Sequence, residues 1–202
     1  MKEIRKRFGF DLDNTLIDYS GAVKEYCRIK SLNHCSDVVM LRDQLRKNHA
    51  SDQEWQLAQA WLYTEGLKFA QIGVGALNLC NYLNGEGYQL YIVSHKTSYT
   101  PIHSGRIALR ETANNWISSS PIAKFFREKW QIYFEPTRIL KVKRIQDLNL
   151  NYFVDDLEVV FNTPNYPSNT KNFLISTEVL QNSKFTCVRD FNSIREILAN
   201  EF

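Results

Sequence analysis

Short apolar runs recur along the chain, separated by longer stretches in which apolar residues follow a helical period. Such runs are typical of buried strands, and strands joined through helices need crossover connections, which make neighbouring strands parallel. We therefore predict an α/β fold with a parallel sheet and helices on both faces. The runs are "RFGF" (7–10), "YQLYIV" (88–93), "IYF" (132–134), "NYFV" (151–154) and "NFLIS" (172–176), and "FNSIREILANEF" (191–202) is predicted as a closing amphipathic helix.

The interval between the first two predicted strands is too long for one crossover. Helical patterns occupy residues 22–30, 38–47, 53–69 and 76–83, and the last of them runs into "NGEG" (84–87), a helix stop and turn. That last helix is a sufficient crossover by itself, so the other three are surplus. We expect a core domain made of residues 1–19 and 72–202, with residues 20–71 forming a small helical insertion after the first strand.

Composition narrows the class of protein. The 202 residues, 44% hydrophobic and 23% charged, suit one domain with a modest insertion, and the net charge of +3 gives no argument for nucleic acid. No apolar stretch approaches the roughly 20 residues that span a bilayer, and no signal-peptide pattern opens the chain. The scattered cysteines, without a CxxC pair, indicate a reduced protein. We expect a cytoplasmic protein without nucleic-acid or membrane partners. The sequence does not determine its oligomeric state.

Polar residues follow three of the predicted strands. Asp11 and Asp13 end the first, Ser94 the second and Asp155 with Asp156 a third, at the edge where open α/β sheets bind ligands. Side chains alternate along a strand, so Asp11 and Asp13 point to one side, roughly 7 Å apart. Two carboxylates at such a short distance repel each other unless a cation lies between them. Together with Asp155 they offer hard oxygen ligands, which predicts a Mg²⁺ site.

The order of these features resembles the haloacid dehalogenase (HAD) superfamily of phosphohydrolases over residues 8–161. "DLDNT" (11–15) is similar to its first motif, the strand ending in Ser94 to its second and "DD" (155–156) to its fourth. The resemblance implies a Rossmann-like fold, Mg²⁺ and an aspartyl-phosphate intermediate. It makes Asp11 the nucleophile, Asp13 the general acid and base, and Ser94 a donor to the transferring phosphoryl group. Asp155 is favoured as the direct metal ligand and Asp156 as its support, although either could contact the metal.

The third motif of this superfamily needs a lysine near the start of the helix before the acidic pair. The segment offers Lys141 and Lys143. Ile145 and Leu148 should face the sheet, and Lys141 precedes Ile145 by one helical turn on the same face. We therefore choose Lys141, with Lys143 as the alternative.

Two further residues are assigned supporting roles at the predicted site. Thr15 should brace the first loop through hydrogen bonds from its side chain. His95, directly after Ser94, stands where it could contact substrate, and so does the next residue, Lys96.

In the superfamily, an insertion after the first motif is a cap that closes over the site, which implies a small phosphorylated metabolite as substrate. Residues 134–167, with "FEPTR" before the lysine and "DDLEV" after it, also resemble a subgroup of uncharacterised HAD-like hydrolases. The leading hypothesis is a Mg²⁺-dependent phosphatase of a small phosphomonoester. A phosphomutase or phosphotransferase of the same fold, and a non-catalytic binding module, remain alternatives.

Overall fold

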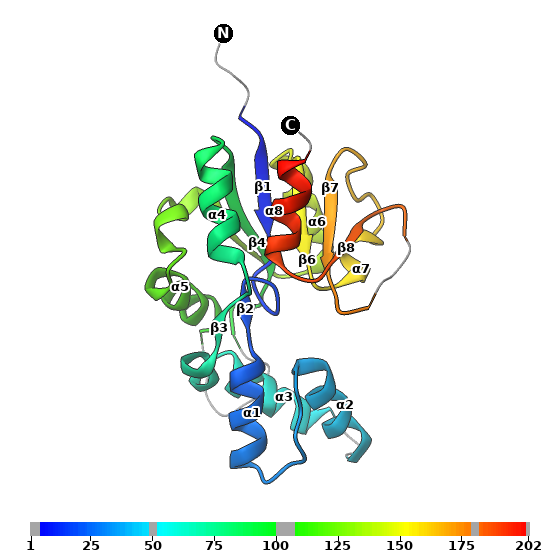
Figure 1. Cartoon of the computed structure of the whole chain (residues 1–202). Coiled ribbons are helices and arrows are strands. Elements are labelled where there is room, and N and C mark those ends of the chain that lie inside the picture. Colours follow the sequence, from blue (N-terminus) through cyan, green and yellow to red (C-terminus); the bar gives the residue numbers. More distant parts are fainter. Residues whose placement is uncertain (1–4, 49–51, 100–107, 179–181, 201–202) are drawn as a thin grey trace.

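The computed structural model describes residues 5–48, 52–99, 108–178 and 182–200 (Figure 1). Within them, six parallel strands form one sheet in the order β5-β4-β1-β6-β7-β8, as the sequence predicts for the fold class. The strands are β1 (Arg7–Phe10), β4 (Gln89–His95), β5 (Ile132–Glu135), β6 (Tyr152–Asp155), β7 (Lys171–Ile175) and β8 (Thr186–Val188).

Helices cover both faces of the sheet, which explains why the strands are apolar throughout instead of alternating. Phe8 and Phe10 belong to the core on the side of α4 (Ala76–Gly85) and α8 (Phe191–Ala199), whereas Phe153 packs in a second cluster with Ile145 of α6 (Arg138–Asp147). The remaining elements of this part are α5 (Leu109–Ser119), α7 (Glu158–Phe161) and the 3₁₀ turns η2 (Ala123–Phe125) and η3 (Lys129–Gln131).

The chain between β1 and α4 forms a helical lobe beyond the carboxyl ends of the strands (Figure 1). A two-stranded antiparallel ribbon carries the chain out and back, with Ile17 opposite Ile72. The predicted insertion at residues 20–71 thus starts and ends at this ribbon. The lobe consists of β2 (Ile17–Asp18), α1 (Ser20–Ile29), α2 (Val38–Asn48), α3 (Gln53–Leu62), η1 (Glu65–Phe69) and β3 (Gln71–Ile72).

The long helix predicted over residues 53–69 is wrong, because α3 ends at Leu62. The hydroxyl of Thr64 donates to the carbonyl of Ala60 at 2.7 Å, a local bond that competes with helical continuation. Gly66 then packs so closely on the ring of Trp61 that a Cβ would lie 2.8 Å from it. Apolar periodicity continues through this turn, so the pattern does not reveal the break.

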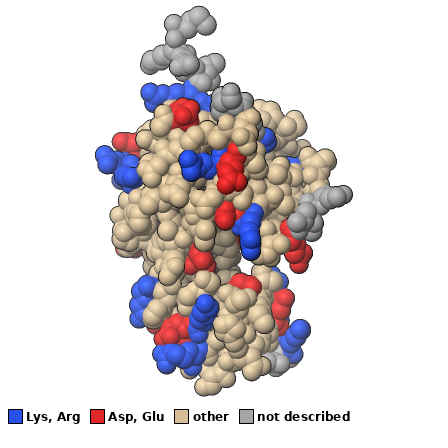
Figure 2. Space-filling model, in the orientation of Figure 1, with Lys and Arg blue, Asp and Glu red and all other residues tan. Residues whose placement is uncertain are grey.

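Three findings concern membrane spanning, surface charge and the cysteines. Among the described residues, no helix combines the length and the apolar character needed to cross a bilayer. On the face drawn in Figure 2, lysines and arginines are interspersed with aspartates and glutamates, without a continuous patch of one sign. Cys27, Cys35, Cys80 and Cys187, all of them in the described part of the chain, are not joined in disulfides.

Candidate active site

A tightly hydrogen-bonded loop after β1 places Asp11 at the edge of the sheet. The backbone N–H of Asp11 donates to the carbonyl of Val154 at 2.9 Å, which continues the pairing with β6. The chain then turns at Asn14, whose φ of 56° is a left-handed conformation that asparagine tolerates. The N–H of Ile17 donates back to the carbonyl of Leu12 at 2.8 Å. The position of Asp11 is therefore set by the sheet on one side and by this turn on the other.

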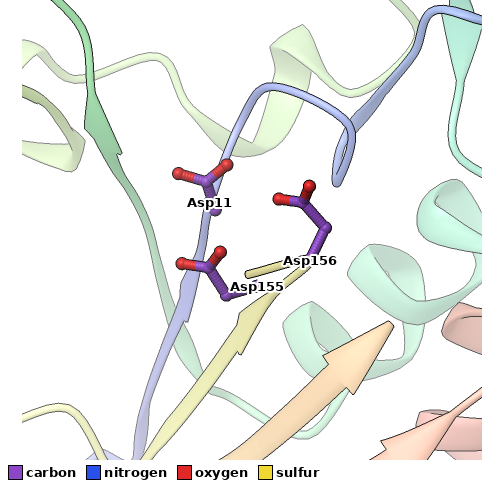
Figure 3. Close-up of side chains that lie close together, drawn as sticks. All are labelled: Asp11, Asp155 and Asp156. Carbon is purple, nitrogen blue, oxygen red and sulfur yellow. The ribbon is translucent and has the colours of Figure 1, made fainter. Parts of the chain in front are cut away.

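Asp11, Asp155 and Asp156 form an acidic cluster, with one carboxylate oxygen of each within 4.8 Å of the others (Figure 3). Burial raises the pKa of Asp11 to about 7, against the lowering effect of Lys141 and with further rises from Asp155 and Asp13. Burial and the same kind of repulsion raise the pKa of Asp156 well above its usual range. Buried carboxylates that resist ionising together are the donor set that a hard divalent cation stabilises.

Lys141 projects from the first turn of α6 into this cluster. Its Nζ lies 2.5 Å from Oδ1 of Asp11 and 2.6 Å from Oδ2 of Asp155, and the side chain is 2% exposed. Burial alone would lower the pKa of Lys141, but the two carboxylates raise it, so the ammonium is charged. Lys143, the alternative, is exposed. The helix start is fixed by Thr137, whose hydroxyl accepts from the N–H of Leu140 at 3.2 Å.

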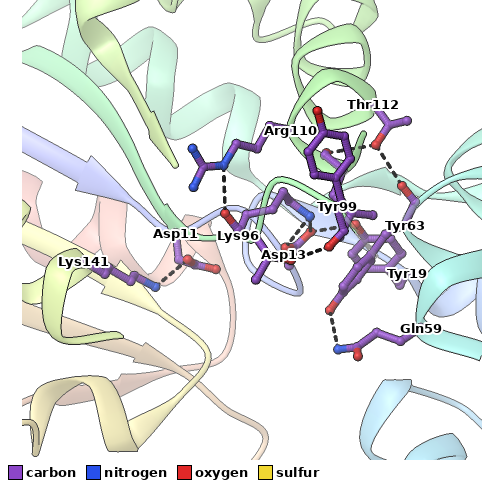
Figure 4. Close-up of polar contacts among 12 residues, drawn as sticks. Asp11, Asp13, Tyr19, Gln59, Tyr63, Lys96, Tyr99, Arg110, Thr112 and Lys141 are labelled. Atoms are coloured by element: carbon purple, nitrogen blue, oxygen red, sulfur yellow. Dashed lines mark hydrogen bonds and ion pairs between the residues drawn. The ribbon is translucent and has the colours of Figure 1, made fainter. Parts of the chain in front are cut away.

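Asp13 lies outside the acidic cluster and has partners of its own (Figure 4). Lys96 Nζ lies 2.8 Å from one of its carboxylate oxygens and 3.1 Å from the other. The hydroxyl of Tyr19 donates to the carboxylate at 2.7 Å. Both carboxylate oxygens of Asp13 therefore accept from donors of the protein itself. These contacts occupy the side chain that the sequence assigns to the metal, so any part of Asp13 in metal binding stays a prediction.

The end of β4 delivers alternate residues to opposite sides. Ser94 and Lys96 are buried and line the same cavity as Asp11, whereas His95 between them is exposed. A ring nitrogen of His95 lies 3.1 Å from the carbonyl oxygen of Pro136, and the ring borders the cavity. Sequence reasoning placed both His95 and Lys96 where they could contact substrate, and chose only His95 as a supporting residue. The alternation of side chains, with Ser94 as the reference, was the signal that could have separated the two residues.

A cavity of about 460 Å³ lies between these residues and the helical lobe, and both contribute to its lining. Asp11, Ser94 and Lys141 line its floor. From the lobe it is lined by Gln56 and Gln59 of α3 and by Tyr63, directly after that helix.

Thr15, in the loop after β1, is buried. Its hydroxyl donates to Oδ1 of Asp156 at 3.3 Å. This bond connects the loop after β1 to Asp156. The sequence suggests that the Thr15 side chain braces the loop, and in the structure its partner is a carboxylate.

No protein-family model matches the chain, and no curated protein matches it. Solved structures do resemble it. A predicted phosphatase from Clostridium acetobutylicum superposes with a TM-score of 0.63 at 14% identity, over 98% of this chain and 100% of that one. A HAD hydrolase of family IA, variant 3, from Entamoeba histolytica gives 0.58 at 16% identity, over 96% of this chain and 98% of that one.

A third similar structure has a different printed name. Protein Tyrosine Kinase A of Mycobacterium tuberculosis gives a TM-score of 0.62 at 16% identity, over 97% of this chain and 99% of that one. At such identities the likeness shows the fold. The chain therefore has the fold of the HAD-superfamily hydrolases, as its motifs predicted, over nearly its whole length.

Proposed function

We propose that the protein is a Mg²⁺-dependent phosphatase that hydrolyses a small phosphomonoester through an aspartyl-phosphate on Asp11. The observation that carries the proposal is the position of Asp11. Its carboxylate borders a cavity together with Lys141 and Ser94, and it belongs to an acidic cluster that suits a divalent cation. A carboxylate nucleophile can approach a phosphate ester only where positive charge offsets the repulsion between the two anions. The site brings the nucleophile and the cationic groups to one place.

The residues that would hold the metal are Asp11 and Asp156, with Asp155 beside them. Both oxygens of Asp155 already accept hydrogen bonds, one from Lys141 and one from the N–H of Leu157 at 3.0 Å. Asp156 accepts the long bond from Thr15, so we take it as the direct ligand of the pair and give Asp155 the role of holding Lys141. Bound Mg²⁺ supplies charge neutralisation between the nucleophile and the phosphate oxygens.

In the first step, Asp11 attacks phosphorus and the bond from phosphorus to the leaving oxygen breaks, while Asp13 gives that oxygen a proton. Lys141 and the hydroxyl of Ser94 hold the phosphoryl oxygens. In the second step, water attacks phosphorus, Asp13 takes a proton from that water, and the bond between phosphorus and Asp11 breaks to release phosphate.

The helical lobe is proposed to act as a cap. Because α3 lines the cavity opposite Asp11, it limits both water and the size of the leaving group, which favours a small phosphorylated metabolite over a macromolecule. A cytoplasmic location, which suits cysteines that are not in disulfides, belongs to the same proposal.

The test is phosphate release from an aryl phosphate by the purified protein, with Mg²⁺ and after chelation, followed by a panel of phosphorylated metabolites. We expect release that depends on Mg²⁺. One of the similar structures is named as a kinase, so the fold by itself does not determine which molecule accepts the phosphoryl group. The assay should therefore identify the phosphorylated product as well as released phosphate. Isomerisation of a sugar phosphate without release would identify a mutase. Binding without turnover across several metals would identify a non-catalytic module.

A further inference from the structure

Lys96 is a buried ammonium that none of the predicted motifs includes. Its side chain is 3% exposed and its Nζ contacts both carboxylate oxygens of Asp13. Removing a lysine from water is costly unless the charge is compensated, so a lysine at this depth needs specific partners. Asp13 is one of them, and the second comes from the helical lobe.

Tyr63, the residue directly after α3, supplies that second partner. Lys96 Nζ lies 4.2 Å from the centroid of the Tyr63 ring, well within the distance at which an ammonium is attracted to an aromatic face. The ring is itself held in place, because Gln59 contacts its hydroxyl at 3.4 Å and Thr112 of α5 donates to its backbone carbonyl at 3.1 Å. Tyr63 therefore connects the lobe to the core at the point where it meets Lys96 (Figure 4).

The backbone of Lys96 is fixed independently of its side chain. Its N–H donates to the carbonyl of Glu135 at 2.9 Å, and its carbonyl accepts from Nε of Arg110 at 3.0 Å. The ammonium therefore extends from a well-anchored point to the carboxylate. Tyr19 contacts Asp13 from the other side, and burial raises the pKa of Tyr19, which keeps its hydroxyl a donor. Two donors from different elements then define where the carboxylate of Asp13 lies.

We propose that Lys96 is a positioning residue for Asp13, held in turn by the ring of Tyr63, so that the helical lobe helps to place the group that transfers the proton. The inference rests on the proposed function for the role of Asp13, whereas the geometry it describes does not. Small errors in the position of a proton donor cost rate steeply, so the ion pair has a catalytic consequence even though Lys96 need not touch the reacting atoms.

The test uses Lys96→Met, which removes the ammonium and keeps an apolar stem, and Tyr63→Leu, which removes the aromatic face. Tyr63→Phe is the matched variant that keeps the face. A misplaced proton donor matters most for a poor leaving group, so kcat for an alkyl phosphate should fall on the order of 10-fold to 10²-fold in Lys96→Met, and much less for nitrophenyl phosphate. Tyr63→Leu should shift the ratio of the two rates in the same direction, and Tyr63→Phe should keep the wild-type ratio.

Because Tyr63 acts through Lys96, the double variant Lys96→Met with Tyr63→Leu should lose no more than Lys96→Met alone. Equal losses on both substrates, or losses that multiply in the double variant, would overturn the proposal.

Crystal structures provide a readout that does not need activity. We expect the Asp13 carboxylate to leave its wild-type position in Tyr63→Leu and in Lys96→Met, and to keep it in Tyr63→Phe. An unmoved carboxylate in both Lys96→Met and Tyr63→Leu would refute the positioning role, whatever the enzyme does. If Lys96→Met does not fold, the two Tyr63 variants still decide the question. A wild-type protein without phosphatase activity would instead refute the proposed function.

Discussion

The ammonium nitrogen of Lys141 lies 2.5 Å from Oδ1 of Asp11, with both side chains almost fully buried. The two residues are 130 positions apart in the sequence, and they meet because α6 begins at the edge of the sheet where β1 ends. The same ammonium reaches Asp155 at 2.6 Å. One buried cation thus faces two of the three carboxylates in the cluster, which leaves an excess of negative charge for a metal to balance.

Replacing Lys141 by Met should damage both stability and activity. Removing one partner from a buried ion pair leaves uncompensated charge, which costs on the order of 3 kcal/mol of unfolding free energy, measured by denaturant titration without metal. Phosphate release should fall on the order of 10²-fold or more, because the phosphoryl charge loses its fixed cation.

Lys143→Met is the control for this variant, since Lys143 is exposed on the same helix. It should stay within about 0.5 kcal/mol of wild type and keep its activity. A Lys143 variant that loses as much as the Lys141 variant would show that the wrong lysine has been assigned.

Metal binding should depend on pH in a direction fixed by the acidic cluster. Because the pKa of Asp11 is raised to about 7 and that of Asp156 is raised as well, protons bind the folded protein more tightly than the unfolded chain between the usual carboxyl range and neutrality. The metal-free protein therefore loses this contribution to stability as pH rises through that window. Mg²⁺ must displace those protons, so the rise in Tm that it causes should be larger at about pH 8 than at about pH 5.

Asp156→Asn should lose most of this Mg²⁺-dependent rise in Tm, whereas Asp147→Asn, on an exposed residue at the end of α6, should keep it. A rise of the same size at both pH values, or one that survives in Asp156→Asn, would mean that the cation binds elsewhere.

Asp13→Asn should slow the enzyme unequally across substrates. An amide cannot supply the proton that an alkyl leaving group needs, so alkyl phosphates should lose on the order of 10²-fold to 10⁴-fold in kcat, and nitrophenyl phosphate distinctly less in the first step. The comparison is made from initial rates on a series of esters with rising leaving-group pKa. A uniform loss along the series would remove the acid role from Asp13.

Much of the site could be predicted from local sequence, because its groups sit at positions that strand and helix periods define. The family resemblance required a lysine near the start of this helix, and the expectation that Ile145 faces the sheet selected Lys141, one turn earlier; Lys141 and Ile145 are both buried. Asp11, Ser94 and Asp155 were found as the polar residues that end apolar runs, and the structure brings them to one edge.

Sequence reasoning missed contacts between the helical lobe and the core, and it missed elements too short to show a period. No sequence pattern predicts the contact between Tyr63 and Lys96. That contact depends on α3 ending before Thr64, whose hydroxyl donates to the carbonyl of Ala60. Likewise Asp13 turns toward Tyr19 because of the left-handed turn at Asn14. The strand β8 was missed because its three residues are too few to show a period.

The central claim is that Asp11 carries the phosphoryl group, and acid quenching during turnover tests it most directly. The protein is mixed with a phosphate-labelled aryl ester and Mg²⁺, stopped in acid, digested and mapped. The account predicts label on the peptide that contains Asp11, lost on treatment with base and absent from Asp11→Asn, whose phosphate release should fall on the order of 10³-fold or more. Label on another residue, or an Asp11→Asn variant that still releases phosphate at the wild-type rate, would contradict it.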